Sequence, residues 1–113
     1  MNLPPLQTIL TPAQISITDA DRAAHSEDQS AYPAVMPDVI VWPHDTAQVS
    51  AVLKWANAHR IPVTAWGAGS SIEGNPIPVH GGVVMDMQRM NAIITVHQED
   101  FQVTVQPGIF YKD

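Results

Sequence analysis

The most informative stretch of this chain is Trp66-Gly67-Ala68-Gly69-Ser70-Ser71-Ile72-Glu73-Gly74-Asn75, which holds three glycines and two serines in ten residues. It follows directly on the apolar run 61–65. Glycine allows a backbone to adopt a positive φ and to approach a ligand closely. Successive free N–H groups in such a turn form a nest that binds an anion, most often a phosphate. The stretch therefore predicts a phosphate-binding loop.

The composition limits what kind of phosphate ligand this loop can serve. The 113 residues are 45% hydrophobic, enough for one domain with a buried core. The net charge is −6 with only five Lys and Arg residues, which argues against nucleic acid or an anionic membrane as a partner. No apolar run reaches about 18 residues, so no transmembrane segment is expected. Any bound phosphate would be held mainly by backbone amides.

The residues before the loop are typical of a strand, a helix and a second strand. We expect strands at residues 39–42 and 61–66, because both runs are apolar and extended in character. Between them, Asp45-Thr46-Ala47-Gln48 resembles a capping box that would start a helix over residues 46–59. The apolar face of this helix would consist of Val49, Val52, Leu53 and Ala56. This order predicts parallel strands joined by a helix.

The segments at the two ends of the chain complete the expected architecture. A further strand is expected at residues 83–87, and residues 92–97 and 101–105 read as a hairpin joined by the acidic turn 98–100. Near the N-terminus, Thr11-Pro12-Ala13-Gln14 is typical of a helix start, and a second short helix is expected within residues 19–28. The class is therefore α+β.

In this order, the elements resemble the FAD-binding domain of the vanillyl-alcohol oxidase and p-cresol methylhydroxylase type, and in particular its branch of FAD-linked D-lactate dehydrogenases and glycolate oxidases. The likeness covers roughly residues 28–113. It lies in the residues Val39 to Pro43, Pro62 to Gly74, Gly81 to Asp86, Met90-Asn91, Glu99-Asp100 and Val103 to Gly108. It implies the N-terminal subdomain of such a domain, with a small partly parallel sheet, flanking helices and a C-terminal β-hairpin. Residues 1–33 would be a helical and irregular segment, and residues 34–113 the incomplete first part of the FAD-binding domain.

The resemblance also implies which residues hold the cofactor. In that family the glycine loop wraps the FAD pyrophosphate with backbone N–H groups. By position, the cofactor-binding residues would be Gly67, Ala68, Gly69, Ser70, Ser71, Gly74 and Asn75, with Pro43, Pro107 and Gly108 as walls near the adenine and ribose. Members that attach FAD covalently through this loop carry a histidine near the second glycine. Ser70 stands at that place here, so we expect non-covalent FAD.

The activity implied by the resemblance is oxidation of a small 2-hydroxy acid, such as D-lactate or glycolate, by a flavin-dependent enzyme. The family's catalytic and substrate-binding residues would lie beyond residue 113, so no catalytic residue is assigned. With part of the site missing, these residues alone would hold FAD weakly or not at all. The location expected is cytoplasmic, either free or peripheral to a membrane electron-transfer chain.

Two alternative interpretations of the chain remain open. One is a stand-alone module without catalysis that binds a nucleotide, a flavin or another protein. The other is an enzyme that resembles the reductase of UDP-N-acetylenolpyruvylglucosamine. A Rossmann site fits poorly, because Ile72 stands where the third glycine of its fingerprint belongs. A Walker A motif is excluded, because no Gly-Lys-Ser/Thr sequence occurs.

The remaining polar residues suggest no second site. The five histidines have no metal-ligand spacing, so we expect no metal site and place most of them on the surface. Asp86 and Arg89 are expected as an exposed pair at the end of a strand. Among the three tryptophans, Trp66 is the one expected to line a cofactor channel.

Overall fold

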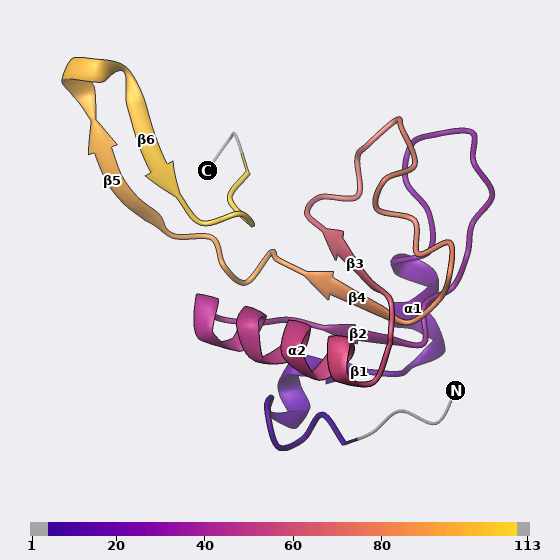
Figure 1. Cartoon of the computed structure of the whole chain (residues 1–113). Helices are drawn as coiled ribbons and strands as arrows, with labels where there is room; N and C mark the ends of the chain where they lie inside the picture. Colours follow the sequence, from indigo (N-terminus) through magenta and orange to yellow (C-terminus); the bar gives the residue numbers. More distant parts are fainter. Residues whose placement is uncertain (1–4, 111–113) are drawn as a thin grey trace.

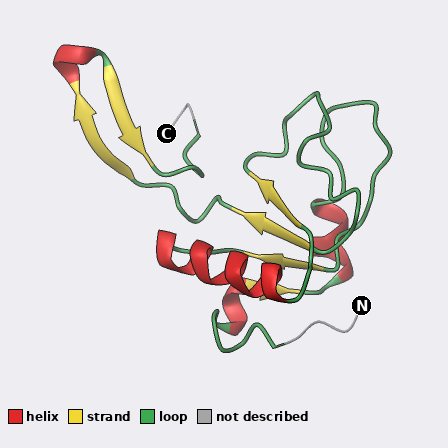
Figure 2. Ribbon diagram, in the orientation of Figure 1, coloured by secondary structure: helices red, strands yellow, loops and turns green. Residues whose placement is uncertain are grey.

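The computed structural model describes residues 5–110, and its centre is a four-stranded sheet (Figures 1 and 2). Across the sheet the strands lie in the order β1 (Ile15–Ser16), β2 (Val39–Val41), β4 (Val83–Asp86) and β3 (Val63–Trp66). β2 and β3 both run parallel to β4, whereas β1 is antiparallel to β2. The expected α+β fold with a partly parallel sheet is confirmed, while the two-residue β1 was not predicted.

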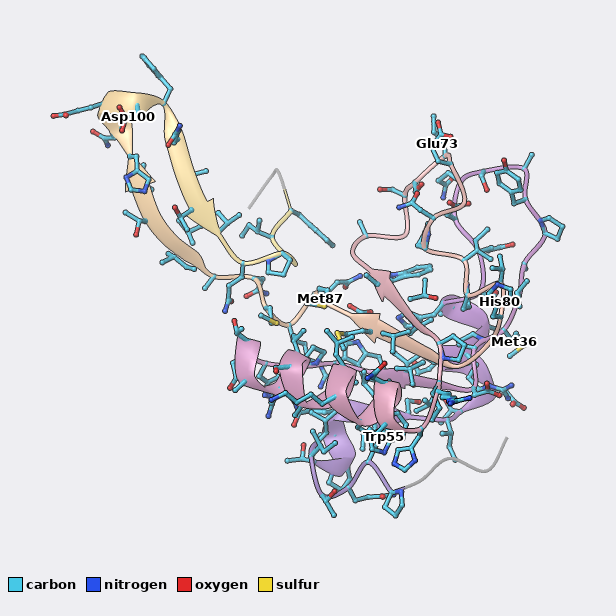
Figure 3. The ribbon with its side chains drawn as sticks, viewed as in Figure 1. Met36, Trp55, Glu73, His80, Met87 and Asp100 are labelled. Atoms are coloured by element: carbon cyan, nitrogen blue, oxygen red, sulfur yellow. The ribbon has the colours of Figure 1, made fainter. Side chains whose placement is uncertain are left out.

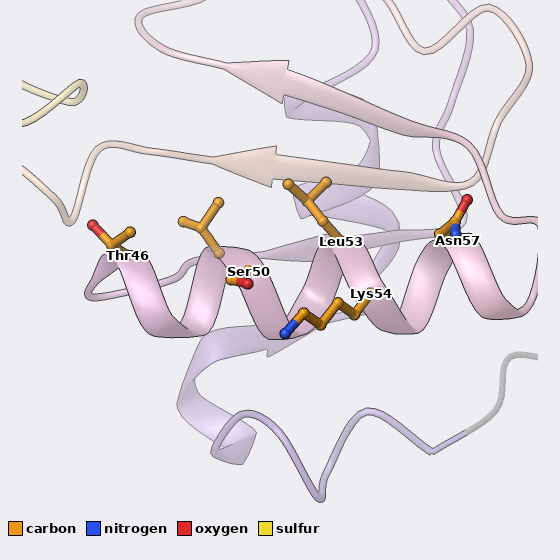
Figure 4. Close-up of a pocket in the computed structure, with 6 residues that line it drawn as sticks. Thr46, Ser50, Leu53, Lys54 and Asn57 are labelled. Atoms are coloured by element: carbon orange, nitrogen blue, oxygen red, sulfur yellow. The ribbon is translucent and has the colours of Figure 1, made fainter.

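The helix α2 (Thr46–Ala58) joins β2 to β3 and covers one face of the sheet. Its Val52, Trp55 and Ala56 are buried against residues of β2 and β4. Leu53, which was predicted to share this face, is instead 46% exposed and lines a hollow on the outside of α2 (Figure 4). The buried face of α2 is therefore centred on Trp55. Its large indole, rather than Leu53, fills the space over the sheet.

Two glutamines fix the start of α2. The side chain of Asp45 accepts a hydrogen bond from the Gln48 N–H at 2.8 Å, as expected of a cap. The return bond of the predicted capping box is absent from the described residues: the Gln48 side chain accepts from the His44 N–H and from the Gln14 amide, both at 2.8 Å. Buried Gln14 also donates to the Trp42 carbonyl at 3.0 Å, so it joins the N-terminal segment to the end of β2.

The N-terminal segment contains a short 3-10 helix, η1 (Pro12–Gln14), at the predicted helix start, followed by the helix α1 (Asp19–Ala24). Before η1, Leu6 and Leu10 are buried in the main core. The predicted second short helix is thus present, and the segment contributes apolar side chains to the same core as α2.

The hairpin formed by β5 (Ile93–His97) and β6 (Gln102–Val105) projects away from the main sheet (Figure 1). A turn of 3-10 helix, η2 (Gln98–Asp100), closes its tip, and Phe101 after it is 97% exposed. Every residue of both strands is exposed, including the apolar Ile94 and Val103. The predicted hairpin is present, with neither face covered by the described residues.

Candidate functional site

The glycine loop leaves the sheet at the edge where the parallel strands end. Because β2, β3 and β4 run in one direction, their carboxyl ends meet at this edge, which is where open α/β sheets bind ligands. A hollow of about 480 Å³ opens there. Seven of the ten predicted cofactor residues line it, namely Gly67, Ala68, Gly69, Ser70, Ser71, Asn75 and Pro107. The loop and the base of the hairpin therefore share one concave surface.

The start of the loop offers hydrogen-bond donors that the described part of the chain does not use. Within residues 5–110, the N–H groups of residues 67–71 donate to no other group. The lining of the hollow includes no Asp, Glu, Lys or Arg side chain. An uncharged wall with successive free amides is the donor set of a backbone nest for an anion. The residues present therefore fit a phosphate held by amides rather than by cationic side chains.

Gly69 gives the loop its shape. Its φ is +70°, and a Cβ built on it would lie 2.2 Å from Cζ2 of Trp66, so the backbone passes directly over the indole. Any side chain would therefore strain the backbone and displace the buried Trp66 ring. Gly67, two residues earlier, has no atom within 4 Å of the equivalent Cβ position. Trp66 also lines the hollow.

The other three predicted cofactor residues lie outside the lining of the hollow. The Gly74 N–H donates to the Asp28 carboxylate at 2.9 Å, so this donor is already in use. Pro43 is fully buried. Gly108 is also buried, and its Cβ would lie 1.9 Å from the Met87 carbonyl oxygen, which explains why glycine is needed there. In this structure Pro43 and Gly108 pack in the interior of the protein and do not line the hollow.

Residues 28–30 tie the far side of the loop to the N-terminal segment. Asp28 accepts from the N–H groups of Ser30 and Gly74, at 2.8 and 2.9 Å. Burial raises the pKa of Asp28, but hydrogen bonds from Ser30 and Gly74 outweigh it and hold that pKa below its usual value. The Gln29 N–H donates to the Ser71 carbonyl at 2.9 Å. Figure 3 shows Glu73 at the outer tip of the loop, away from Met87 at the base of the hairpin.

A buried pair beneath the loop was not predicted. Nε2 of His25, just after α1, lies 2.7 Å from Oδ2 of Asp86, and both side chains are buried. The expectation of a surface histidine and of an exposed Asp86–Arg89 pair is therefore wrong at these positions. Arg89 instead donates to the Ala13 carbonyl at 2.8 Å and lies over the Trp42 ring. His25 and Asp86 are 61 positions apart in the sequence, so no local pattern joins them.

The pKa of His25 results from opposing effects. Burial lowers it, but hydrogen bonds to the Asp86 carboxylate and the Asp21 carbonyl, with the charges of both aspartates, raise it above its usual value. Nδ1 lies 2.7 Å from the Asp21 carbonyl oxygen. Because a carbonyl oxygen only accepts, Nδ1 carries a proton, and protonated His25 donates from both ring nitrogens.

The described residues also form two further hollows. A second hollow of about 390 Å³ is lined entirely by residues of the exposed face of α2 (Figure 4). A third, of about 350 Å³, lies between the loop exit and the segment around Tyr32. No group of side chains suited to a metal ion occurs within residues 5–110, and none of the helices there is long and apolar enough to cross a membrane.

Known proteins are similar to this chain in sequence and in fold. Residues 37–113 match the family model described as "FAD binding domain". The chain is 38% identical over 95 residues to D-lactate dehydrogenase (cytochrome), mitochondrial, of Arabidopsis thaliana, covering 81% of this chain and 17% of that protein. It is 31% identical over 102 residues to glycolate oxidase subunit GlcD of Bacillus subtilis, covering 90% and 22%. The solved structure of p-cresol methylhydroxylase with bound substrate matches with a TM-score of 0.82 and 25% identity, covering 93% of this chain and 21% of that one. The chain thus spans about a fifth of the length of these relatives.

Proposed function

Because this chain belongs to the FAD binding domain family, we propose that its glycine loop binds the pyrophosphate of FAD in a flavin-dependent oxidoreductase. The observation that carries the proposal is the row of uncommitted N–H groups of residues 67–71 at the wall of the hollow. Such a nest can bind a pyrophosphate without lysine or arginine. The −6 net charge of the chain is compatible with a phosphate ligand only because these donors are backbone amides.

The residues of this chain would bind and orient the cofactor rather than react. Gly67, Ala68 and Gly69 would donate to the phosphate oxygens, with Ser70 and Ser71 continuing the nest. The Ser71 hydroxyl already donates to the Asn75 side chain, which leaves its N–H as the donor for the ligand. The flavin supplies hydride chemistry when bound. Ser70 offers no imidazole for a covalent link, so we propose non-covalent FAD.

We further propose that residues 34–113 are the first part of an FAD-binding domain that continues in the whole protein, with residues 1–33 as its N-terminal segment. The β5–β6 hairpin supports this division, because an isolated two-stranded hairpin with apolar side chains on exposed faces is marginally stable in water. In the proposed cofactor site, Gly74 and Asn75 complete the loop, and Pro43, Pro107 and Gly108 are assigned by position as walls near the adenine and ribose; of these three, Pro107 lines the hollow. The location proposed is the cytoplasm, either free or peripheral to a membrane electron-transfer chain.

The substrate proposed for the whole protein is a small 2-hydroxy acid, with D-lactate and glycolate as the first candidates. This rests on relatives named D-lactate dehydrogenase and glycolate oxidase subunit. The purified whole protein should carry yellow flavin, and acid precipitation should release all of it into the supernatant as FAD. Anaerobic addition of D-lactate or glycolate should bleach the flavin, whereas L-lactate serves as the control. Protein without flavin, or flavin that stays in the precipitate, would contradict the proposal.

A further inference from the structure

Asp86, at the end of β4, contacts two separate supports of the glycine loop. Its Oδ2 lies 2.7 Å from Nε2 of His25, and its Oδ1 accepts from the Gln88 N–H at 2.9 Å. Only 3% of the residue is exposed. A buried carboxylate is costly unless it is paired and hydrogen-bonded, and these two contacts satisfy its two oxygens.

The first support runs through His25 to Trp66. The imidazole is fixed at both nitrogens, by the Asp21 carbonyl and by Asp86. Its ring centroid lies 4.9 Å from that of Trp66, and the rings are tilted by 57°. The Trp66 ring is in turn the surface over which Gly69 passes. The orientation of the imidazole therefore limits where the indole and the positive-φ turn above it can lie.

The second support runs through Gln88 to Gly67. The Gln88 side-chain amide donates to the Gly67 carbonyl at 2.7 Å, while its backbone N–H is held by Asp86. Fixing the Gly67 carbonyl also fixes the peptide plane that carries the Ala68 N–H, since the peptide unit is planar. The two supports thus meet the loop at Gly67 and at Gly69, on both sides of Ala68.

We propose that Asp86 is a positioning residue that orients the N–H groups of the phosphate-binding turn through His25 and Trp66 on one side and Gln88 on the other. The proposal rests on the proposed function for its ligand, but the positioning itself is a property of the chain without ligand. A nest binds an anion well when its donors are held in place before binding. Asp86 performs this role without touching the ligand.

A ligand-free measurement tests the positioning directly. Gly69 lies against the six-membered ring of the Trp66 indole. Its proton chemical shifts therefore report the ring current of that side chain. In Asp86→Asn and His25→Gln protein, we expect the Gly69 shifts to move toward unstructured values while shifts in α2 and β5 stay in place. His80→Gln is the matched control, because His80 is exposed. Unchanged Gly69 shifts in both variants would overturn the proposal.

The second measurement is a titration with FAD itself, followed by the amide shifts of residues 67–71. Loss of pre-organised donors should weaken binding about tenfold in Asp86→Asn, which corresponds to about 1.4 kcal/mol. In Gln88→Ala the loss should be smaller and centred on Gly67 and Ala68. If FAD shifts amides of the wild-type protein outside residues 67–71 and leaves those of the loop in place, the proposed function fails, while the ring-current result still decides the positioning.

The pH dependence of FAD affinity separates positioning from simple structural support. The charged groups facing His25 are Asp86 from β4 and Asp21 from α1, with Arg89 across the Trp42 ring. Affinity should fall as pH rises through the raised pKa of His25, and this fall should disappear in His25→Gln protein. Should Asp86→Asn fail to fold, Gln88→Ala decides: wild-type affinity and unchanged Gly67 and Ala68 shifts in that variant would contradict the proposal.

Discussion

The glycine loop and the β5–β6 hairpin both follow parallel strands of the main sheet, β3 and β4, yet they are held very differently. The loop is tied to Asp28 and Gln29 at its far side and to Gln88 at its start, and it passes over the buried Trp66. The hairpin is held by its own strand pairing, and both of its faces are exposed. The comparison indicates that the described residues determine the shape of the loop, whereas the apolar side chains of the hairpin need another surface to cover them.

The sharpest contrast is between two isoleucines. Ile40 in β2 is fully buried, whereas Ile94 in β5 is 62% exposed. Ile40→Ala should lower the free energy of unfolding by about 2–5 kcal/mol, because it leaves a cavity beside Trp66 and Val84. Ile94→Ala should change it by less than about 0.5 kcal/mol. Urea denaturation measures both, and equal losses would show that the hairpin is part of the same core.

Within the loop, two glycines form a matched pair. Gly69→Ala should cost about 1–3 kcal/mol of backbone strain, since a Cβ at a positive φ would meet the Trp66 ring. Gly67→Ala should be tolerated in folding, because the space around it is open. Thermal or urea denaturation compares the two variants. Equal stability of the two proteins would mean that the indole does not support the turn.

Stability should also depend on pH through His25, near the loop end of the molecule. The pKa of His25 is raised above its ordinary value of 6.5, so its stabilising contribution is complete below that value and is lost as pH rises through the higher folded pKa. The difference in unfolding free energy between wild-type and His25→Gln protein should therefore shrink with rising pH. His97→Gln, in the exposed strand β5, provides the matched control variant.

The smallest effect is expected at the tip of the hairpin. Phe101 is 97% exposed and has a φ of 54°, a conformation that asparagine adopts more readily than phenylalanine. Phe101→Asn should change the unfolding free energy of the chain by less than about 0.5 kcal/mol. A larger loss in chemical denaturation would show that Phe101 packs on a surface in solution.

The elements that could be predicted from the sequence are those with a local pattern. Strand runs, the α2 helix with its Asp45 cap and the glycine loop all have signals within a few residues. The supports of the loop could not be predicted in this way. The His25–Asp86 pair spans 61 positions and the Gln14–Gln48 bond spans 34, so each depends on how the fold brings distant segments together.

The burial of individual side chains also could not be predicted from their spacing in the sequence. Spacing placed Leu53 on the buried face of α2, but the choice between Leu53 and Trp55 depends on the shape of the sheet beneath. The burial of Asp86 could not be predicted from the sequence either, because its partner His25 comes from the segment after α1. Five of the seven cofactor residues that share the hollow are contiguous, Gly67 to Ser71, whereas Pro43, Gly74 and Gly108 lie outside its lining.

The most direct test of the phosphate-binding loop is a titration of the ¹⁵N-labelled chain with FAD, ADP and riboflavin, followed by backbone amide shifts. Even weak binding by these residues alone should move the amides of residues 67–71 with FAD and ADP, because both carry a pyrophosphate. Riboflavin has no phosphate and should leave the same amides in place. Shifts that cluster on α2 or the hairpin, or equal responses to all three ligands, would contradict the assignment of this loop to the pyrophosphate.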